Sequence, residues 1–75
     1  GLQLLGTPEE GQFEVRSSYI TELEVWSLDG RKLETRTLDG QANEVNRFQY
    51  FQRGVFVLSG VTTSGERIQL KVVGV

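Results

Sequence analysis

The 75 residues leave room for a single domain, and a chain of this size buries only about 60% of its unfolded surface. The sequence contains neither cysteine nor histidine, which excludes disulfides, nucleophiles activated by histidine, and zinc sites with sulfur or nitrogen ligands. A formal net charge of −2, with both signs interspersed, gives no basic footprint for nucleic acid. No apolar run approaches the roughly 20 residues of a membrane span.

Residues 1–10 are interpreted as a linker or an edge segment from a preceding domain, and residues 11–75 as the folded domain. Pro8 cannot donate a hydrogen bond to a strand ladder and disfavours helical geometry at Thr7, which favours the linker interpretation. The apolar residues 2–5 would instead suit an edge strand.

The first half of the folded domain contains two predicted strands. Residues 12–16 alternate between polar and apolar types, and the serines that follow them indicate a turn or a bulge. Residues 21–28 are the clearest strand of this half, because glutamates alternate there with Leu23 and Val25. The alternation breaks at Trp26, so the end of this strand is expected to be buried on both faces.

Asp29-Gly30 is the strongest short hairpin signal in the sequence and predicts a tight turn. The return segment, residues 31–38, is mostly polar and charged, as suits an edge strand, where charge discourages unwanted pairing. A second Leu-Asp-Gly at residues 38–40 is interpreted as recurring turn chemistry rather than a structural repeat. Residues 44–48 predict a short strand, and residues 49–53 a polar–aromatic connector.

The C-terminal third is the segment around which the rest of the chain is organised. Residues 55–58 form a continuous apolar run, which predicts a strand buried on both faces. Residues 67–72 alternate strictly between polar and apolar types, and Gly65 tolerates the positive φ that a short hairpin loop needs. A terminal β-hairpin is therefore expected. With about six or seven short strands and no helical periodicity, the sequence predicts an all-β fold, a small immunoglobulin-like antiparallel β-sandwich.

The sequence contains little that is typical of an enzyme. Its nine glycines are spread singly at turns, so no phosphate-binding loop is present. Glu22 and Glu24 share one strand face about 7 Å apart, but carboxylates at this spacing usually mark a solvated face rather than an acid–base pair. Asp29, Asp39 and Glu44 are the nominal calcium ligands, although turn formation explains both aspartates better. We therefore expect no enzyme, no metal and no cofactor.

The aromatic residues support two interpretations. One is a stacking platform for sugar rings on a surface adhesion or carbohydrate-binding module, with Phe48, Tyr50 and Phe51 as candidate contact aromatics. The other is core packing, because each buried aromatic stabilises a small core by about 2 kcal/mol. Both interpretations stay open for Tyr50 and Phe51. The platform would also include Tyr19 and Trp26, whereas packing is favoured for Trp26, Phe13 and Phe56.

Four motifs follow one another in an order that is found in one protein family. They are Gly11-Gln12-Phe13, Leu23-Glu24-Val25-Trp26-Ser27-Leu28-Asp29-Gly30-Arg31, Gly54-Val55-Phe56-Val57-Leu58, and Gly65-Glu66-Arg67 through Lys71-Val72-Val73. Over about residues 6 to 75 this order resembles the C-terminal sorting domain of proteins exported by the type IX (Por) secretion system of Bacteroidota. That family shows a Gly-x-apolar strand start, a strand leading into a Gly-Arg/Lys turn, a Gly-x-Tyr strand and a lysine-bearing apolar terminus.

The resemblance implies an immunoglobulin-like sandwich at the C-terminus of a larger exported cargo protein. Such domains are read in the periplasm as an address for passage across the outer membrane, after which the parent reaches the cell surface or the medium. In many members a sortase-like peptidase then removes the domain as the cargo is joined to a surface lipopolysaccharide. The expected partners are the outer-membrane secretion machinery and, where cleavage occurs, that peptidase.

On this interpretation the recognised surface includes Gly54, Phe56, Lys71, Val72 and Val73, with Gly54 needed for backbone geometry and Lys71 presented outward. Recognition would use a folded surface or an available strand edge, for example by strand addition to a receptor. A sandwich without cross-links leaves its edges unpaired, so we also expect the fragment to dimerise or to exchange strands.

Overall fold

The computed structural model describes residues 1–9, 11–50 and 54–73. These residues form seven strands, and they contain no helix long and apolar enough to cross a membrane. The strands are β1 (Leu2–Glu9), β2 (Gln12–Ser17), β3 (Ile20–Ser27), β4 (Lys32–Thr37), β5 (Glu44–Gln49), β6 (Val55–Thr62) and β7 (Arg67–Val73).

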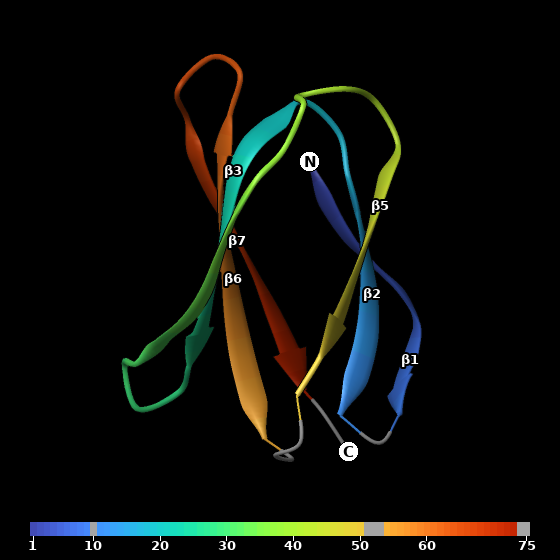
Figure 1. Ribbon diagram of the computed structural model, residues 1–75, viewed down its shortest axis with the longest axis vertical. Helices are drawn as coiled ribbons and strands as arrows, with labels where there is room; N and C mark the ends of the chain where they lie inside the picture. The colour runs from blue at the N-terminus through green and yellow to red at the C-terminus, as the bar shows by residue number, and fades with distance from the viewer. Residues whose placement is uncertain (10, 51–53, 74–75) are drawn as a thin grey trace.

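The strands make two antiparallel sheets that face each other (Figure 1). One sheet has the order β1-β2-β5 and the other the order β4-β3-β6-β7, so the chain changes sheet after β2, after β4 and after β5. In an immunoglobulin-like sandwich the first, second and fifth strands share one sheet, and the third, sixth and seventh share the other. The described strands follow this division, with β4 added beside β3. The predicted fold class is therefore confirmed.

The core lies between the sheets, because alternation along each strand sends every second side chain to the inner face. Full burial of an apolar side chain of this kind stabilises the fold by about 1.5–3 kcal/mol. The prediction that Phe13 and Phe56 pack in the core is confirmed. The buried apolar residues are Phe13, Val15, Ile20, Leu23, Val25, Phe48, Phe56, Leu58 and Val72.

Ser27 accepts the hydrogen bonds that hold the turn between β3 and β4 together. The N–H of Gly30 donates to the Ser27 carbonyl at 3.1 Å, and the N–H of Arg31 donates to the Ser27 hydroxyl at 3.2 Å. The Ser27 hydroxyl also donates to the carboxylate of Asp29. The hairpin predicted at Asp29-Gly30 is confirmed, and Ser27 is the residue that completes it.

A bulge in β4 changes which of its side chains face the core, compared with a strand that alternates without interruption. The register shifts between Val25 and Trp26 of β3, which leaves Leu33 as an extra residue on β4. As a result Leu33 faces outward and is 37% exposed, whereas Glu34 and Arg36 lie opposite inward-facing residues of β3. The predicted polar edge strand is present, but two of its charged side chains point between the sheets.

Strand β1 corrects the linker interpretation of the first ten residues. It pairs with β2 at the edge of the three-stranded sheet, where Leu2 and Leu4 pack against the core and Pro8 is buried. Proline is tolerated at a sheet edge because its missing N–H would face away from the ladder. For the described residues 1–9, the edge-strand alternative is the correct one.

The outer face of the four-stranded sheet is less buried than the sequence predicts. Trp26 is half-buried there, with Lys32 Nζ 5.8 Å from the centroid of its ring, and is not part of the core. Leu28 lies in the turn and is 70% exposed. On the outer face of β6, Val55 and Val57 are half-buried and Ser59 is buried, so this face is only partly covered. The reason is that no second layer covers this face in the described part of the chain.

Ile20→Val should lower the free energy of unfolding by about 1 kcal/mol, because a methyl group is removed from a fully buried site. Val73→Ala removes two methyl groups from an outward-facing side chain that is 59% exposed, and should cost about 0.5 kcal/mol or less. Denaturant unfolding followed by the fluorescence of Trp26 measures both changes. A larger loss for Val73→Ala than for Ile20→Val would contradict this assignment of the core.

Candidate functional site

The candidate site is the terminal hairpin of β6 and β7, at one edge of the four-stranded sheet (Figure 1). Strand β6 pairs with β3 on one side and with β7 on the other. The register between β6 and β7 runs without interruption from Val55↔Val73 to Val61↔Arg67. The other edge of β7 has no strand partner among the described residues.

The loop of this hairpin closes on Thr62, in the same way as the β3–β4 turn closes on its serine. The N–H of Gly65 donates to the Thr62 carbonyl at 2.9 Å, and the N–H of Glu66 donates to the Thr62 hydroxyl at 3.0 Å. Gly65 has a φ of 88°, which costs glycine little. The predicted turn at Gly65 is confirmed, and these local contacts determine the register of β7.

The predicted recognition residues do not lie on one surface. Phe56 and Val72 are opposite each other on the inner face and are 5% and 0% exposed. Lys71 and Val73 face outward. The prediction that all of these residues belong to a shared surface is wrong for Phe56 and Val72, because alternation along the two strands sends both side chains into the core.

Gly54 directly precedes β6 and has a φ of 157°, a backbone conformation that residues with a side chain rarely adopt. A Cβ at this position would meet no heavy atom of the described residues within 4 Å, its chain neighbours apart. The constraint at Gly54 is therefore on the backbone and not on the space around it.

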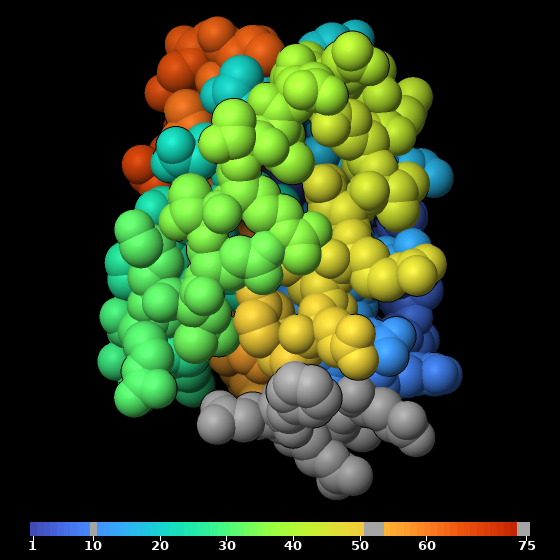
Figure 2. All heavy atoms as spheres, viewed as in Figure 1, coloured from blue at the N-terminus to red at the C-terminus, as the bar shows by residue number. Residues whose placement is uncertain are grey.

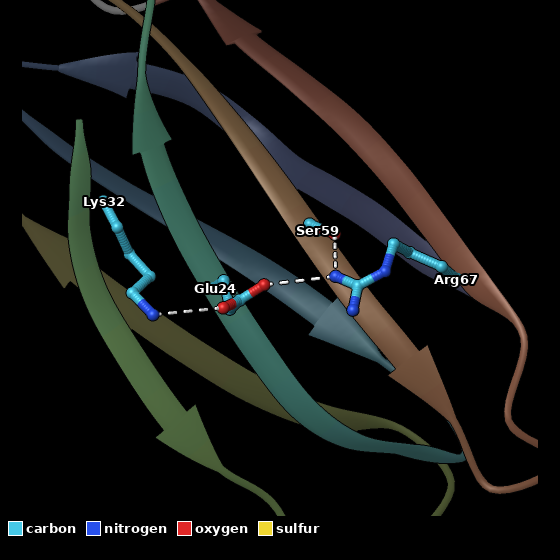
Figure 3. Close-up of polar contacts among 4 residues, drawn as sticks. All are labelled: Glu24, Lys32, Ser59 and Arg67. Atoms are coloured by element: carbon cyan, nitrogen blue, oxygen red, sulfur yellow. Dashed lines mark hydrogen bonds and ion pairs between the residues drawn. The ribbon is translucent and has the colours of Figure 1, made fainter. Parts of the chain in front are cut away.

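A polar cluster on the outer face joins all four strands of the larger sheet (Figure 3). Glu24 of β3 pairs with Lys32 of β4 at 3.5 Å and with Arg67 of β7 at 3.1 Å. Arg67 also donates to the hydroxyl of Ser59 on β6 at 2.9 Å. We call these four residues the Glu24 cluster. Sequence reasoning missed it, because the partners come together only once the strand register is known.

The Glu24 carboxyl remains ionised in this cluster. Burial acts to raise its pKa, but the hydrogen bonds and charges of Arg67 and Lys32 outweigh burial and hold the pKa below the usual 4.5. The side chain is 15% exposed, whereas Glu22 on the same face is exposed. A carboxylate held ionised by two cations is a poor proton donor at neutral pH, so the cluster organises the sheet rather than forming an acid–base pair.

Most of the aromatic side chains gather inside the sandwich. The ring of Phe13 stacks on Phe48, with 5.1 Å between centroids, and on Phe56, with 5.9 Å. Tyr50 is half-buried and stacks on Phe56 at 5.2 Å. Phe48 is 1% exposed, so its prediction as a contact aromatic is wrong, because the ring fills the space between the sheets. The third candidate, Phe51, lies outside the described residues.

Tyr19 and Trp26 do not join this stack. Tyr19 lies in the two-residue crossing from β2 to β3, has a φ of 60° and is 58% exposed. Its backbone is held there by hydrogen bonds from its N–H to the Gln41 carbonyl and from the Thr63 N–H to its own carbonyl. Trp26 lies on the outer face of the other sheet. The described residues therefore do not assemble the predicted stacking platform.

Charged side chains of β4 close the side of the sandwich between β4 and β5. The guanidinium of Arg36 lies over the ring of Phe48, 4.0 Å from its centroid, and pairs with Glu34. Glu34 accepts a hydrogen bond from the Tyr50 hydroxyl at 2.9 Å. The side chains of the green β4 and the yellow β5 meet on this side of the molecule (Figure 2). A cation over a partly desolvated ring is worth about 1–2 kcal/mol, so these charges stabilise the core that they cover.

The nominal calcium ligands do not form a site. Asp29 lies in the β3–β4 turn, Asp39 is exposed between β4 and β5, and Glu44 opens β5 and accepts a hydrogen bond from the N–H of Gln41 at 2.8 Å. Within residues 1–9, 11–50 and 54–73, no three His, Cys, Asp or Glu side chains lie close enough together to hold a metal ion.

Comparisons of the chain with protein-family models, with curated proteins and with solved structures found no match. The candidates for a functional role are therefore features of the chain itself. They are the ordered motifs, the outward-facing Lys71 and Val73, and the edge of β7, which pairs with no other strand in the described part of the chain.

Glu24→Gln should lower the stability of the protein at about pH 7, and the difference from the wild type should narrow as the pH falls. A carboxyl whose pKa is lower in the folded state contributes stability above its unfolded pKa, here 4.5, and loses it as the pH falls through the folded value. Urea midpoints between about pH 7 and about pH 2 measure this. Glu22→Gln is the matched control and should show a smaller difference. A loss for Glu24→Gln that stays constant with pH would contradict the ion pairing.

Tyr50 should ionise well above the pH at which tyrosine normally does. Burial raises its pKa above the usual 10, the hydrogen bond to Glu34 and the charge of Glu34 add to the rise, and Arg36 opposes it. The resulting stability is present below about pH 10 and is lost as the pH rises toward the folded pKa. In a Tyr19→Phe variant the remaining tyrosine is Tyr50. Its tyrosinate absorbance should appear at higher pH in buffer than in denaturant, and identical curves would contradict the burial.

Proposed function

We propose that this domain is a C-terminal export signal that directs a larger protein across the outer membrane through the type IX secretion system. The folded domain is recognised in the periplasm, and its cargo then reaches the cell surface or the medium. Its partners are the secretion machinery and, where the domain is removed, a sortase-like peptidase. The domain itself catalyses no reaction and needs no cofactor.

The backbone at the four motif glycines is the observation that carries this proposal. Gly11 precedes β2, Gly30 closes the β3–β4 turn, Gly54 precedes β6 and Gly65 closes the β6–β7 turn. All four have a positive φ, with values of 78°, 87°, 157° and 88°. The residues that define the motif pattern therefore occupy positions where the backbone favours glycine. Gly6 and Gly40, which lie outside the motifs, also have a positive φ, so this agreement supports the resemblance only together with the order of the motifs.

The residues of the hairpin fall into a buried group and an outward-facing group, as suits a signal that a receptor recognises in the folded state. Gly54 sets the backbone at the start of β6, and Phe56 and Val72 fill the core behind the hairpin. Lys71 and Val73 face outward. A receptor would therefore contact Lys71, Val73 and the backbone edge of β7, while the buried pair acts indirectly by holding the strand in place.

A periplasmic reporter fused in front of residues 1–75 should be exported by a bacterium that carries this machinery. Lys71→Glu should lower the exported fraction roughly tenfold, because a reversed charge at an interface costs about 1.4 kcal/mol or more. Arg16→Glu makes the same change of charge on the outer face of the other sheet, and should leave export unchanged. Immunoblots of the medium, the cell surface and the periplasm measure the fractions.

Retention of the unaltered fusion in the periplasm would disprove the export function. Equal export of the Lys71→Glu and Arg16→Glu fusions would show that the secretion machinery does not recognise Lys71 on the hairpin. Urea unfolding of both variants checks that the fold is intact. Deleting residues 71–75 is a weaker test, because it also removes Val72 from the core.

A further inference from the structure

Within residues 1–9, 11–50 and 54–73, the two sheets have four edge strands, β1, β4, β5 and β7. Proteins usually protect such edges, because their unpaired N–H and C=O groups attract other strands. In β1 the register shifts between Leu5 and Glu9, and Pro8 lies within the shift, so the edge is interrupted. In β4 the bulge turns Glu34 and Arg36 inward, so an added strand would place its inner side chains beside two charges.

The remaining edges differ in the side chains that they send inward. Those of β5 include the polar Glu44 and Asn46, whereas those of β7 are Ile68, Leu70 and Val72. Ile68 and Leu70 are only half-buried. Strand β7 also pairs with β6 without a bulge and contains neither glycine nor proline. Among the described strands, β7 is the edge best suited to accept another strand.

The hydrogen bonds at the hairpin loop determine which backbone groups of β7 face this edge. The N–H of Thr62 donates to the Glu66 carbonyl at 2.8 Å, so these two residues form a hydrogen-bonded pair. In an antiparallel ladder such pairs recur at every second residue, so Ile68, Leu70 and Val72 bond to β6. The N–H and C=O groups that face the free edge belong to Arg67, Gln69, Lys71 and Val73.

The charges on β7 disfavour two of the three antiparallel registers that pair at least five residues of this edge with a second copy. Only registers that bring outward-facing backbone groups together can form. Placing Gln69 opposite Gln69 of a second copy would set Arg67 opposite Lys71, and placing Lys71 opposite itself would set two ammonium groups together. Like charges directly opposite each other destabilise a sheet.

One register avoids both conflicts and still pairs all seven residues of the strand. It is centred on Leu70, which lies opposite Leu70 of the second copy. Apolar side chains then meet apolar ones on the inner face, and no charge meets a like charge directly. The other opposed pairs are Ile68 with Val72, Gln69 with Lys71, and Arg67 with Val73.

We propose that the β7 edge binds a second copy of this chain, by antiparallel pairing of β7 with β7 in the register centred on Leu70. The pairing makes a closed two-fold dimer in which the two larger sheets continue into each other. It brings the half-buried Ile68 and Leu70 of both copies together at the new sheet centre. The argument uses only the geometry and charges of β7, so it does not depend on the export function.

Single cysteines test the register, because the chain has no cysteine of its own. In this register the two Leu70 positions form a pair that is not hydrogen-bonded, with Cα atoms about 4.5 Å apart, which a disulfide can bridge. The two Gln69 positions lie about 8–9 Å apart, which is too far. In a glutathione redox buffer Leu70→Cys should form a covalent dimer at least about tenfold faster than Gln69→Cys. Equal rates would overturn the register.

Charge substitutions at the exposed Gln69 test the dimer without changing the core. Gln69→Glu sets a carboxylate opposite Lys71 of the second copy, and Gln69→Lys sets a like charge there, twice in each dimer. The dissociation constant of Gln69→Lys should be roughly tenfold higher than that of Gln69→Glu, and added salt should reduce the difference. Sedimentation equilibrium of the 75-residue chain measures these constants. A monomeric wild type at about 1 mM, or equal constants for the two variants, would overturn the proposal.

Discussion

The antiparallel register between β3 and β6 constrains every other part of the larger sheet. It sets Val25 opposite Leu58 on the inner face and Glu24 opposite Ser59 on the outer face. Gly60 lies where the sheets approach closely, since a Cβ there would be 3.3–3.4 Å from side chains of β3 and β1. Strands β4 and β7 attach to the two sides of this central pair, so the orientation of their side chains follows from it. The Glu24 cluster then links all four strands across the face that water reaches.

Much of the fold could be predicted from the sequence, because alternation and turn chemistry are encoded in about ten neighbouring residues. The inner and outer faces of β7 and the two turns of the larger sheet are examples. A bulge is not encoded in this way. Leu33 is apolar, as inward-facing residues usually are. One shift in register nevertheless turns its side chain outward and turns the side chains of Glu34 and Arg36 inward. The strand that contains Pro8 was predicted only as an alternative, for residues 2–5, because its stability comes from packing on strands that are distant in sequence.

The terminal hairpin predicted from the sequence is present, but the motifs did not assign the roles of its residues. A motif does not separate residues needed for packing from residues available for contact. Phe56 and Val72 belong to the first kind, Lys71 and Val73 to the second, and only burial distinguishes them. The Glu24 cluster had no local signal at all, since the bond between Glu24 and Arg67 joins residues 43 positions apart across three neighbouring strands.

The two open sides of the sandwich differ in the side chains that cover them. This difference affects how a partner could recognise the folded domain. On the side of β4 and β5, Arg36 covers Phe48, and its charge is balanced by a carboxylate that Tyr50 also binds. On the side of β1 and β7, Leu2 and Leu70 remain only partly buried beside an unpaired edge. An exposed apolar edge makes an isolated domain prone to aggregation. The same edge presents a row of unpaired N–H and C=O groups at fixed positions, to which another strand can bind. That row exists only while the neighbouring core residues hold β7 on β6, so a partner that pairs with it selects the folded chain over the unfolded one.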